Sequence, residues 1–306
     1  MTTDFNNLRF FCDHIVRKCG EINELSEEQL AEEFRLVYLK GLPTNLRALK
    51  AVAASCGIRL SELERMPQNI RGYHEIYEDS KNIYFRKGDA VSGIQNTILH
   101  EIREMMETMF VEVQPGYAPL RTSARHIAAN RFASAVLLPE QDFRSKVYET
   151  GLDIIALSRM YSKSCSQVLL RMGEVLQGRL FMYAALYEPN AENEWRVTYW
   201  TGCSNDSYPD ANVYGLDGLF PRRGRPVMPG SLVDMAIKKG KPHLAHIALT
   251  DDIDDEALAA IARPLMISGT IAKTALVVLL GQNLDLFQPQ VKRSSPVIAD
   301  GFYRHL

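Results

Sequence analysis

The sequence lacks any apolar run as long as the about 18 residues that a membrane-spanning helix needs. Its start also lacks a basic stretch followed by an apolar one, which is the pattern of a secretion signal. Both absences argue against a membrane or exported protein. We therefore expect a soluble, globular protein of the cytoplasm.

The sequence also has few cysteines, and they are not arranged as pairs. The five cysteines are odd in number and scattered, and none forms a Cys-x-x-Cys motif. This pattern excludes a disulfide framework and indicates reduced thiols, which fits the cytoplasm. The cysteines are Cys12, Cys19, Cys56, Cys165 and Cys203.

A strong charge of either sign is missing as well. Lysine and arginine total 35 against 37 aspartate and glutamate residues, which gives no whole-protein attraction to nucleic acid or to an anionic membrane. We find no internal repeat and no low-complexity tract. The 306 residues, of which 46% are hydrophobic, instead suggest about two domains with real cores.

The first half of the chain has mainly helical patterns. Residues 10–40 and 44–57 show apolar residues at helical spacing, and Thr44 and Gly57 are the expected start and stop of the second helix. Residues 60–65 suggest a short turn. The alternating, aromatic residues 72–86 predict two strands joined by the polar residues 78–82. Longer helices are expected over 93–110 and 123–138, separated by a loop at 113–120.

The second half of the chain has fewer helical patterns and more strand-like segments. Residues 153–160 and 166–176 predict a helix, a tight turn and a helix, after which 180–186, 195–200 and 274–280 resemble strands. Helices are expected at 232–238 and 256–267. We predict an α+β fold with domains 1–145 and 178–290, a helical segment 146–177 between them, and a weakly held C-terminal tail, 291–306.

The residues that carry chemistry begin with His100-Glu101-Ile102-Arg103-Glu104. This His-Glu-x-x-Glu spacing differs by one residue from the zinc peptidase motif His-Glu-x-x-His. Residues four apart lie on one helix face, so His100 and Glu104 can hold one ion. Glu101, beside them, is the candidate general base that takes a proton from the attacking water. A short motif of common residues also arises by chance on a solvated helix face.

The following helix supplies the candidate third ligand. His126 begins a stripe that continues through Asn130, Ala133 and Leu137, and the small alanines would allow close packing against the first helix. Such packing would bring His126 next to His100 and Glu104. Taken alone, a histidine such as His126 is more often an ordinary core or surface histidine than a metal ligand.

The segment 126–139, His-Ile-Ala-Ala-Asn-Arg-Phe-Ala-Ser-Ala-Val-Leu-Leu-Pro, resembles the corresponding segment of the ImmA/IrrE metallopeptidase family. The resemblance covers residues 44–143. The family has histidine where this chain has Glu104, and glutamate where it has His126. The two departures together restore two histidines and one carboxylate, which suit a Zn²⁺ ion with an open fourth position. The same donors with open positions also suit ferrous iron, but Glu101 favours zinc.

This resemblance implies a zincin-like peptidase domain and a cytoplasmic zinc endopeptidase. Its expected substrate is a helix-turn-helix (XRE-type) transcriptional repressor, whose cleavage would switch on a stress-response or antiviral defence operon. In order and length, residues 178–290 are similar to the GAF-like sensor domain of IrrE-type proteins. Such a domain would bind an activating small molecule or DNA. The group that stabilises the oxyanion stays open among Tyr84, Arg103, Tyr117 and Arg125.

Two further segments carry weaker expectations. Residues 153–176 resemble a helix-turn-helix, in which Ser162, Lys163, Ser166, Gln167 and Arg171 could contact DNA, although many such hairpins only pack against a neighbour. Cys203, expected in a loop at 202–205, and Cys165 are candidate regulatory thiols that could block the open metal position.

Two readings compete with the peptidase. One is a regulator without enzymatic activity that binds DNA or a ligand and whose metal site is structural or lost. The other is a zinc hydrolase acting on a substrate that is not a peptide. Glu104 in the motif helix is the best argument for a lost site.

Overall fold

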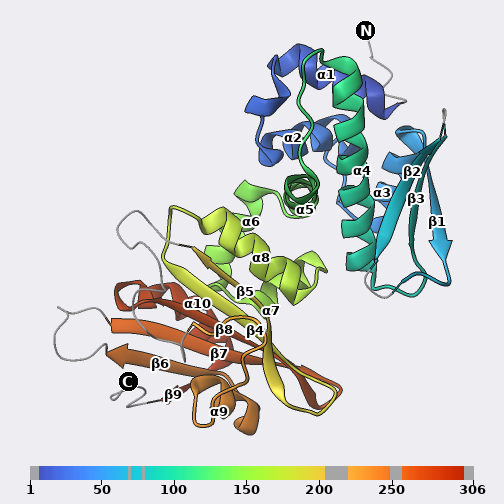
Figure 1. Ribbon diagram of the computed structural model, residues 1–306. Coiled ribbons are helices and arrows are strands. Elements are labelled where there is room, and N and C mark those ends of the chain that lie inside the picture. Colours follow the sequence, from blue (N-terminus) through green and yellow to red (C-terminus); the bar gives the residue numbers. More distant parts are fainter. Residues whose placement is uncertain (1–6, 68–69, 78–79, 204–219, 249–256, 300–306) are drawn as a thin grey trace. The chain divides into compact units, whose positions relative to one another are not determined.

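The chain forms two compact units, residues 1–140 and 141–306, in a computed structural model that describes residues 7–67, 70–77, 80–203, 220–248 and 257–299 (Figure 1). The first unit is mainly helical with a small sheet. The second is built around a larger sheet. The predicted α+β class is therefore confirmed.

Five α-helices and two short irregular helices make up most of the described first unit, together with three strands. The helices are α1 (Leu8–Cys19), η1 (Ile22–Glu24), α2 (Glu27–Phe34), η2 (Arg35–Leu39), α3 (Leu46–Ser55), α4 (Val91–Val113) and α5 (Thr122–Leu137). The strands are β1 (Ile58–Leu63), β2 (Gly72–Tyr77) and β3 (Ser80–Arg86). Strand β3 lies in the middle, parallel to β1 and antiparallel to β2.

Helix α4 is the core helix of the first unit. Its expected apolar stripe is buried throughout, and it comprises Ile94, Ile98, Ile102, Met105, Met106 and Met109. Each such side chain contributes roughly 1.5–3 kcal/mol when it is fully buried. The polar side of the helix is buried too, with Thr97, Glu101 and Glu104 each at most 9% exposed. Glu101 and Glu104 are thus enclosed by protein and not in bulk water.

Helix α5 packs across α4 through small residues. Ala129 and Ala133 are fully buried, as the sequence pattern predicts, and Phe132 makes an edge-to-face contact with Phe34 of α2 at 5.4 Å between ring centroids. Because alanine lets two helix backbones approach closely, α5 can bring the side chain of His126 to α4.

Two local predictions for the first unit are wrong. Residues 60–65, expected as a turn, belong largely to β1, whose backbone hydrogen bonds with β3 make it a strand. The N-cap of α3 is Asn45, whose side chain accepts from the backbone N–H of Ala48, whereas the hydroxyl of Thr44 bonds to Arg35. Either residue type can cap a helix, and only tertiary contacts chose between them.

The second unit combines a six-stranded sheet with helices. The helices are α6 (Glu140–Thr150), α7 (Ile154–Tyr161), α8 (Cys165–Leu176), α9 (Leu232–Lys239), η4 (Gly281–Phe287) and α10 (Gln288–Ser294). The strands are β4 (Met182–Pro189), β5 (Trp195–Cys203), β6 (His243–Ala248), β7 (Ala257–Ile267), β8 (Thr270–Leu280) and β9 (Val297–Ala299). Their order in the sheet is β5-β4-β8-β7-β6-β9, antiparallel except for the β6–β9 pair.

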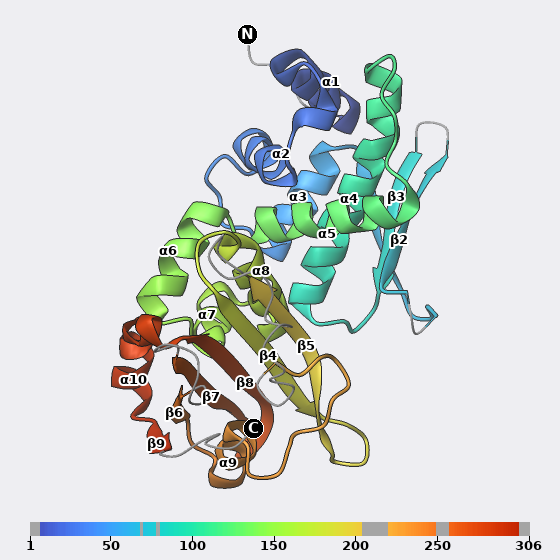
Figure 2. The same ribbon diagram turned by 60° about the vertical axis from the view of Figure 1, so that its left-hand side comes forward.

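Helices cover both faces of this sheet (Figure 2). On one face, Leu232 and Ala236 of α9 share a core cluster with Ala185 and other residues of the sheet. On the other face, Gly173 of α8 lies so close to Thr201 of β5 that an added Cβ would meet the Thr201 Oγ1 at 2.0 Å. The predicted helix-turn-helix segment is therefore part of the packing of this unit.

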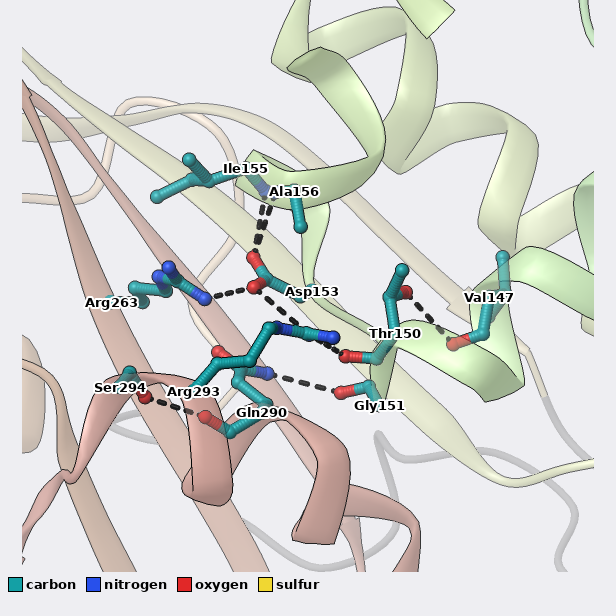
Figure 3. A network of polar contacts seen from close by, with 10 residues as sticks. All are labelled: Val147, Thr150, Gly151, Asp153, Ile155, Ala156, Arg263, Gln290, Arg293 and Ser294. Atoms are coloured by element: carbon teal, nitrogen blue, oxygen red, sulfur yellow. Dashed lines mark hydrogen bonds and ion pairs between the residues drawn. The ribbon is translucent and has the colours of Figure 1, made fainter. Parts of the chain in front are cut away.

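A buried polar network joins α7 to β7 and α10 within the second unit (Figure 3). The carboxylate of Asp153 caps α7 through the backbone N–H groups of Ile155 and Ala156, and it forms ion pairs with Arg263 and Arg293. Asp153 is only 1% exposed, so a buried charge is compensated from both sides.

Two predictions for the second unit are wrong. Residues 257–267, expected within a helix at 256–267, form strand β7, and Glu256 lies outside the described residues. Residues 258–262 are all apolar and buried, as suits a central strand covered on both faces, and such a run has no clear period. The tail expected from residue 291 instead includes the end of α10 and strand β9, while residues 300–306 lie outside the described part.

Residues 10–40, expected as one helical segment, instead form α1, η1, α2 and η2, with breaks at residues 20–21 and 25–26. The remaining expected helices and strands are found within a few residues of their predicted limits. The expected domain limits after residues 145 and 177 stay predictions. By contacts, the helical segment 146–177 belongs to the second unit. No described helix has both the length and the apolar character that crossing a bilayer requires.

Candidate metal centre

The three predicted metal ligands come together between α4 and α5. His100 and Glu104 project from successive turns of α4, and His126 projects from α5. One potential ligand atom from each side chain lies within 4.8 Å of the other two. The imidazole rings of the two histidines are nearly parallel, with their centroids 5.6 Å apart.

Two of the three distances between these atoms match the ligand-to-ligand distances around a tetrahedral zinc ion. Glu104 Oε1 lies 3.3 Å from His100 Nε2 and 2.6 Å from His126 Nδ1, and the two nitrogens are 3.4 Å apart. Ligand atoms about 2.0–2.1 Å from a tetrahedral zinc ion lie about 3.3–3.4 Å from one another. Two of the three edges agree with that value, and the third is shorter.

The bonding state of Glu104 provides a test of whether a metal fits. Its Oε1 is buried and has no hydrogen-bond partner, although two imidazole nitrogens lie close by. A buried carboxylate oxygen without a hydrogen bond is costly. A cation shared with the two nitrogens would satisfy it. The residues present therefore fit a divalent metal with His₂Glu ligation, and the side chain of His126, which is 56% exposed, leaves one side open to solvent.

Asn130 of α5 completes the surroundings of His100. Its side-chain oxygen lies 3.1 Å from His100 Nδ1, so a proton on Nδ1 leaves Nε2 free for a metal. Burial by itself would lower the pKa of His100, but contacts with Glu104, Glu101 and Asn130 outweigh it, and the pKa is raised. The contact with His100 in turn lowers the pKa of Glu104. The site thus favours an ionised Glu104.

The predicted base Glu101 lies on the neighbouring side of α4, where it meets a residue that the sequence analysis missed. His74 Nδ1 of β2 lies 2.7 Å from Glu101 Oε2 and 4.0 Å from Glu104 Oε2. His74, Glu101 and Glu104 form a second group whose potential ligand atoms all lie within 4.8 Å of one another. The alternation of residues 72–77 could have placed His74 on one face of a strand, but nothing in the sequence says which helix that face meets.

Two of the four candidates for oxyanion stabilisation are engaged elsewhere. Arg103 binds Glu27 and Glu107, and the hydroxyl of Tyr117 donates to Glu107. The ring of Tyr84 stacks on Tyr73 at 4.8 Å, within the small sheet. Arg125 precedes His126 on α5, and its Nε is buried without a hydrogen bond. The structure thus selects no residue for this role.

The DNA-contact candidates of the second unit are partly buried. Arg171 and Lys163 are 3% and 6% exposed, and burial lowers the pKa of Lys163 to about 8. Ser162, Ser166 and Gln167 remain partly accessible. The burial of Lys163 and Arg171 is typical of a helical hairpin that packs against its neighbours, whereas a DNA-recognition helix exposes such side chains.

The two candidate regulatory cysteines also belong to the second unit. Cys203 was expected in a loop at 202–205, but it is the last residue of β5. Residues 204 and 205 lie outside the described part. Its thiol donates to the carbonyl oxygen of Leu180 at 3.1 Å, and burial raises its pKa to about 12. Cys165 is 4% exposed. Both thiols are thus buried, and their regulatory role stays a prediction.

Comparison with known proteins identifies a structure with a similar fold but does not assign the chain to a family. No protein-family model matches the sequence, and no curated protein matches it. Among solved structures, a Mycobacterium tuberculosis transcriptional regulator is similar, with a TM-score of 0.54 over 91% of this chain and 82% of that chain. The two sequences are 14% identical, so the likeness shows a shared fold alone. The resemblance to ImmA/IrrE peptidases and to GAF-like domains stays a prediction.

Proposed function

We propose that this protein is a zinc-dependent endopeptidase whose metal is held by His100, Glu104 and His126. The observation that carries this proposal is the buried Oε1 of Glu104, which has no hydrogen bond yet lies between two imidazole nitrogens. Two histidines and one carboxylate, with a side open to solvent, form the ligand set of many catalytic zinc sites.

The chemistry assigned to the remaining residues follows from their positions. A bound zinc ion would polarise the scissile carbonyl group and make a water molecule more acidic. Glu101, one residue after a ligand and 6% exposed, accepts the proton of the attacking water and returns it to the leaving amine. Asn130 keeps the imidazole of His100 in the tautomer that presents Nε2.

The substrate that we propose is a helix-turn-helix transcriptional repressor, and its cleavage would release a stress-response or defence operon. This step rests on the resemblance of residues 126–139 to the ImmA/IrrE family. A place in transcription control is also supported by the fold shared with the Mycobacterium tuberculosis protein, which is a transcriptional regulator. In this proposal the second unit would bind the activating molecule.

Metal analysis by plasma mass spectrometry tests the site directly. Wild-type protein should contain about one zinc ion per chain, and Glu104→Ala and His126→Ala should each lose most of it. Thr108→Ala is the matched control, because Thr108 is exposed one turn further along α4. Zinc that is absent from the wild type, or indifferent to both ligand substitutions, would contradict the proposal.

Cleavage is tested separately with purified helix-turn-helix (XRE-type) repressors from the organism that carries this gene. Glu101→Gln should keep its zinc but cleave about 10²- to 10⁴-fold more slowly, which is the usual contribution of a general base. A second candidate function, a regulator without enzymatic activity, is favoured by the same likeness to a transcriptional regulator. Zinc that is retained while no repressor is cleaved would support that alternative.

A further inference from the structure

Strand β2 is brought unusually close to α4 at one residue. Gly72 faces Thr97, and a Cβ added to Gly72 would lie 2.2 Å from Thr97 Cγ2 and 2.8 Å from the backbone oxygen of Tyr84. Real Cβ atoms essentially never approach other atoms so closely. Only glycine therefore fits at this position without moving the strand away from the helix.

The close approach at Gly72 sets the position of the next residue on the same strand face. Side chains two apart on a strand point the same way, so His74 shares the face of Gly72. Two residues of strand advance by about 6.6 Å, and four residues of helix advance by about 6 Å. The step from Gly72 to His74 thus matches the step from Thr97 to Glu101. His74 Nδ1 accordingly reaches Glu101 Oε2 at 2.7 Å.

The contact is sheltered, and it involves one oxygen of the carboxylate. The side chains of His74 and Glu101 are 20% and 8% exposed. An Nδ1–H group that donates to Oε2 leaves Oε1 of Glu101 for the attacking water. A buried carboxylate with such a fixed donor loses the freedom to rotate away from the metal site.

We propose that His74 is a positioning residue that holds Glu101 in the orientation needed for proton transfer, and that Gly72 exists to let β2 bring it there. The catalytic consequence rests on the proposed peptidase function, whereas the contact itself does not. His74 acts through Glu101, so its removal lowers the rate of the chemical step and leaves metal binding and substrate affinity in place.

The first test uses two substitutions at the same position. His74→Leu removes the donor, and His74→Asn retains an N–H group attached at the same distance along the side chain. For cleavage of the repressor, His74→Leu should lower kcat about 10- to 100-fold, as a misplaced reacting group does, with unchanged KM and zinc content. His74→Asn should recover most of the loss. Tyr77→Leu is the control, because Tyr77 lies on the opposite strand face and is 70% exposed.

The second test does not depend on activity. Nitrogen-15 spectra of the histidine side chains, recorded on zinc-loaded protein, report which ring nitrogen of His74 carries a proton. A protonated Nδ1 whose signal shifts in Glu101→Ala, and in Gly72→Ala, supports the inference. An unprotonated Nδ1, or a kcat that His74→Leu leaves unchanged, overturns it. If no repressor is cleaved by the wild type, the proposed function fails while these spectra still decide the contact.

Discussion

The side-chain oxygen of Asn130 lies 3.1 Å from Nδ1 of His100, and the Nε2 of the same ring faces Glu104. One side of the imidazole ring is thus held by α5, while the other side faces Glu104, with which it would share the proposed metal. Hydrogen bonds of this kind typically change metal affinity about 10- to 100-fold.

We therefore expect Asn130→Ala to bind zinc about 10- to 100-fold more weakly than the wild type, because His100 loses the partner that fixes its tautomer. Competition with a chelating dye measures the affinity. Ile127→Ala, on an exposed part of the same helix, serves as the control. Equal affinities in all three proteins would show that the contact has no role in metal binding.

A second prediction concerns Glu104 of α4 and His126 of α5, which stand where the ImmA/IrrE family has histidine and glutamate. His126→Glu leaves one histidine and two carboxylates and should weaken zinc binding. Adding Glu104→His restores two histidines and one carboxylate and should recover it, because the same donors then surround the same point. Isothermal titration with zinc compares the single and double variants. A double variant that binds no better than the single one would refute the idea that the two positions compensate each other.

Buried charges near the site give a pH-dependent prediction. Burial alone would raise the pKa of Glu107, but Arg103, the backbone N–H of Leu120 and Tyr117 together lower it from its ordinary value of 4.5. A carboxyl group whose pKa is depressed on folding stabilises the fold above pH 4.5, and this contribution is lost as the pH falls through the folded-state pKa.

At pH 7, Glu107→Gln should lower the free energy of unfolding by about 3–5 kcal/mol, as expected when one partner of a buried ion pair is removed. The difference from the wild type should shrink progressively below pH 4.5. Urea titrations followed by circular dichroism at several pH values measure it. Glu112→Gln, at an exposed position of α4, should change the stability by less than about 0.5 kcal/mol. A difference that does not depend on pH would contradict the assignment.

In the second unit, Asp153 both caps α7 and neutralises two arginines. Asp153→Ala should destabilise this unit by about 3–5 kcal/mol, because Arg263 and Arg293 would lose their carboxylate. Asp153→Asn keeps a capping oxygen and should have a smaller effect. The two tryptophans, Trp195 and Trp200, both belong to this unit, so that their fluorescence follows its unfolding. Glu192→Gln, at an exposed site, is the control.

The burial of Cys203 predicts low reactivity. With a pKa of about 12, its thiol is almost entirely protonated at pH 8, and it should react with iodoacetamide at least about tenfold more slowly than the more accessible Cys19. Peptide mass spectrometry after timed labelling measures both rates. Fast labelling of Cys203 would mean that a thiolate forms. Cysteine regulation would be ruled out if Cys203→Ala and Cys165→Ala both left cleavage unchanged.

The candidate ligands could be predicted from the sequence because their geometry is mostly local. His100, Glu101 and Glu104 are brought together by one helix, whose period is fixed by backbone hydrogen bonding. His126 could be added because alanines on the same stripe predict where α5 packs. His74 could not be predicted, because its contact with Glu101 depends on how a strand lies along a helix, which no sequence period encodes.

Strand β7 shows a second reason why sequence patterns could not predict part of the structure. Its alanine-rich, apolar residues have no period, so the choice between helix and strand depended on the neighbouring strands that supply its hydrogen bonds. The sequence by itself determined the α+β class, most helices, and the identity of the three candidate ligands, since these follow from backbone periodicity and side-chain chemistry. Only the tertiary structure decided three features: the contact of His74 with Glu101, the burial of Glu104 Oε1 without a hydrogen bond, and the burial of Cys203. Each of these depends on which surfaces meet across long separations in the chain, and packing alone selects those surfaces.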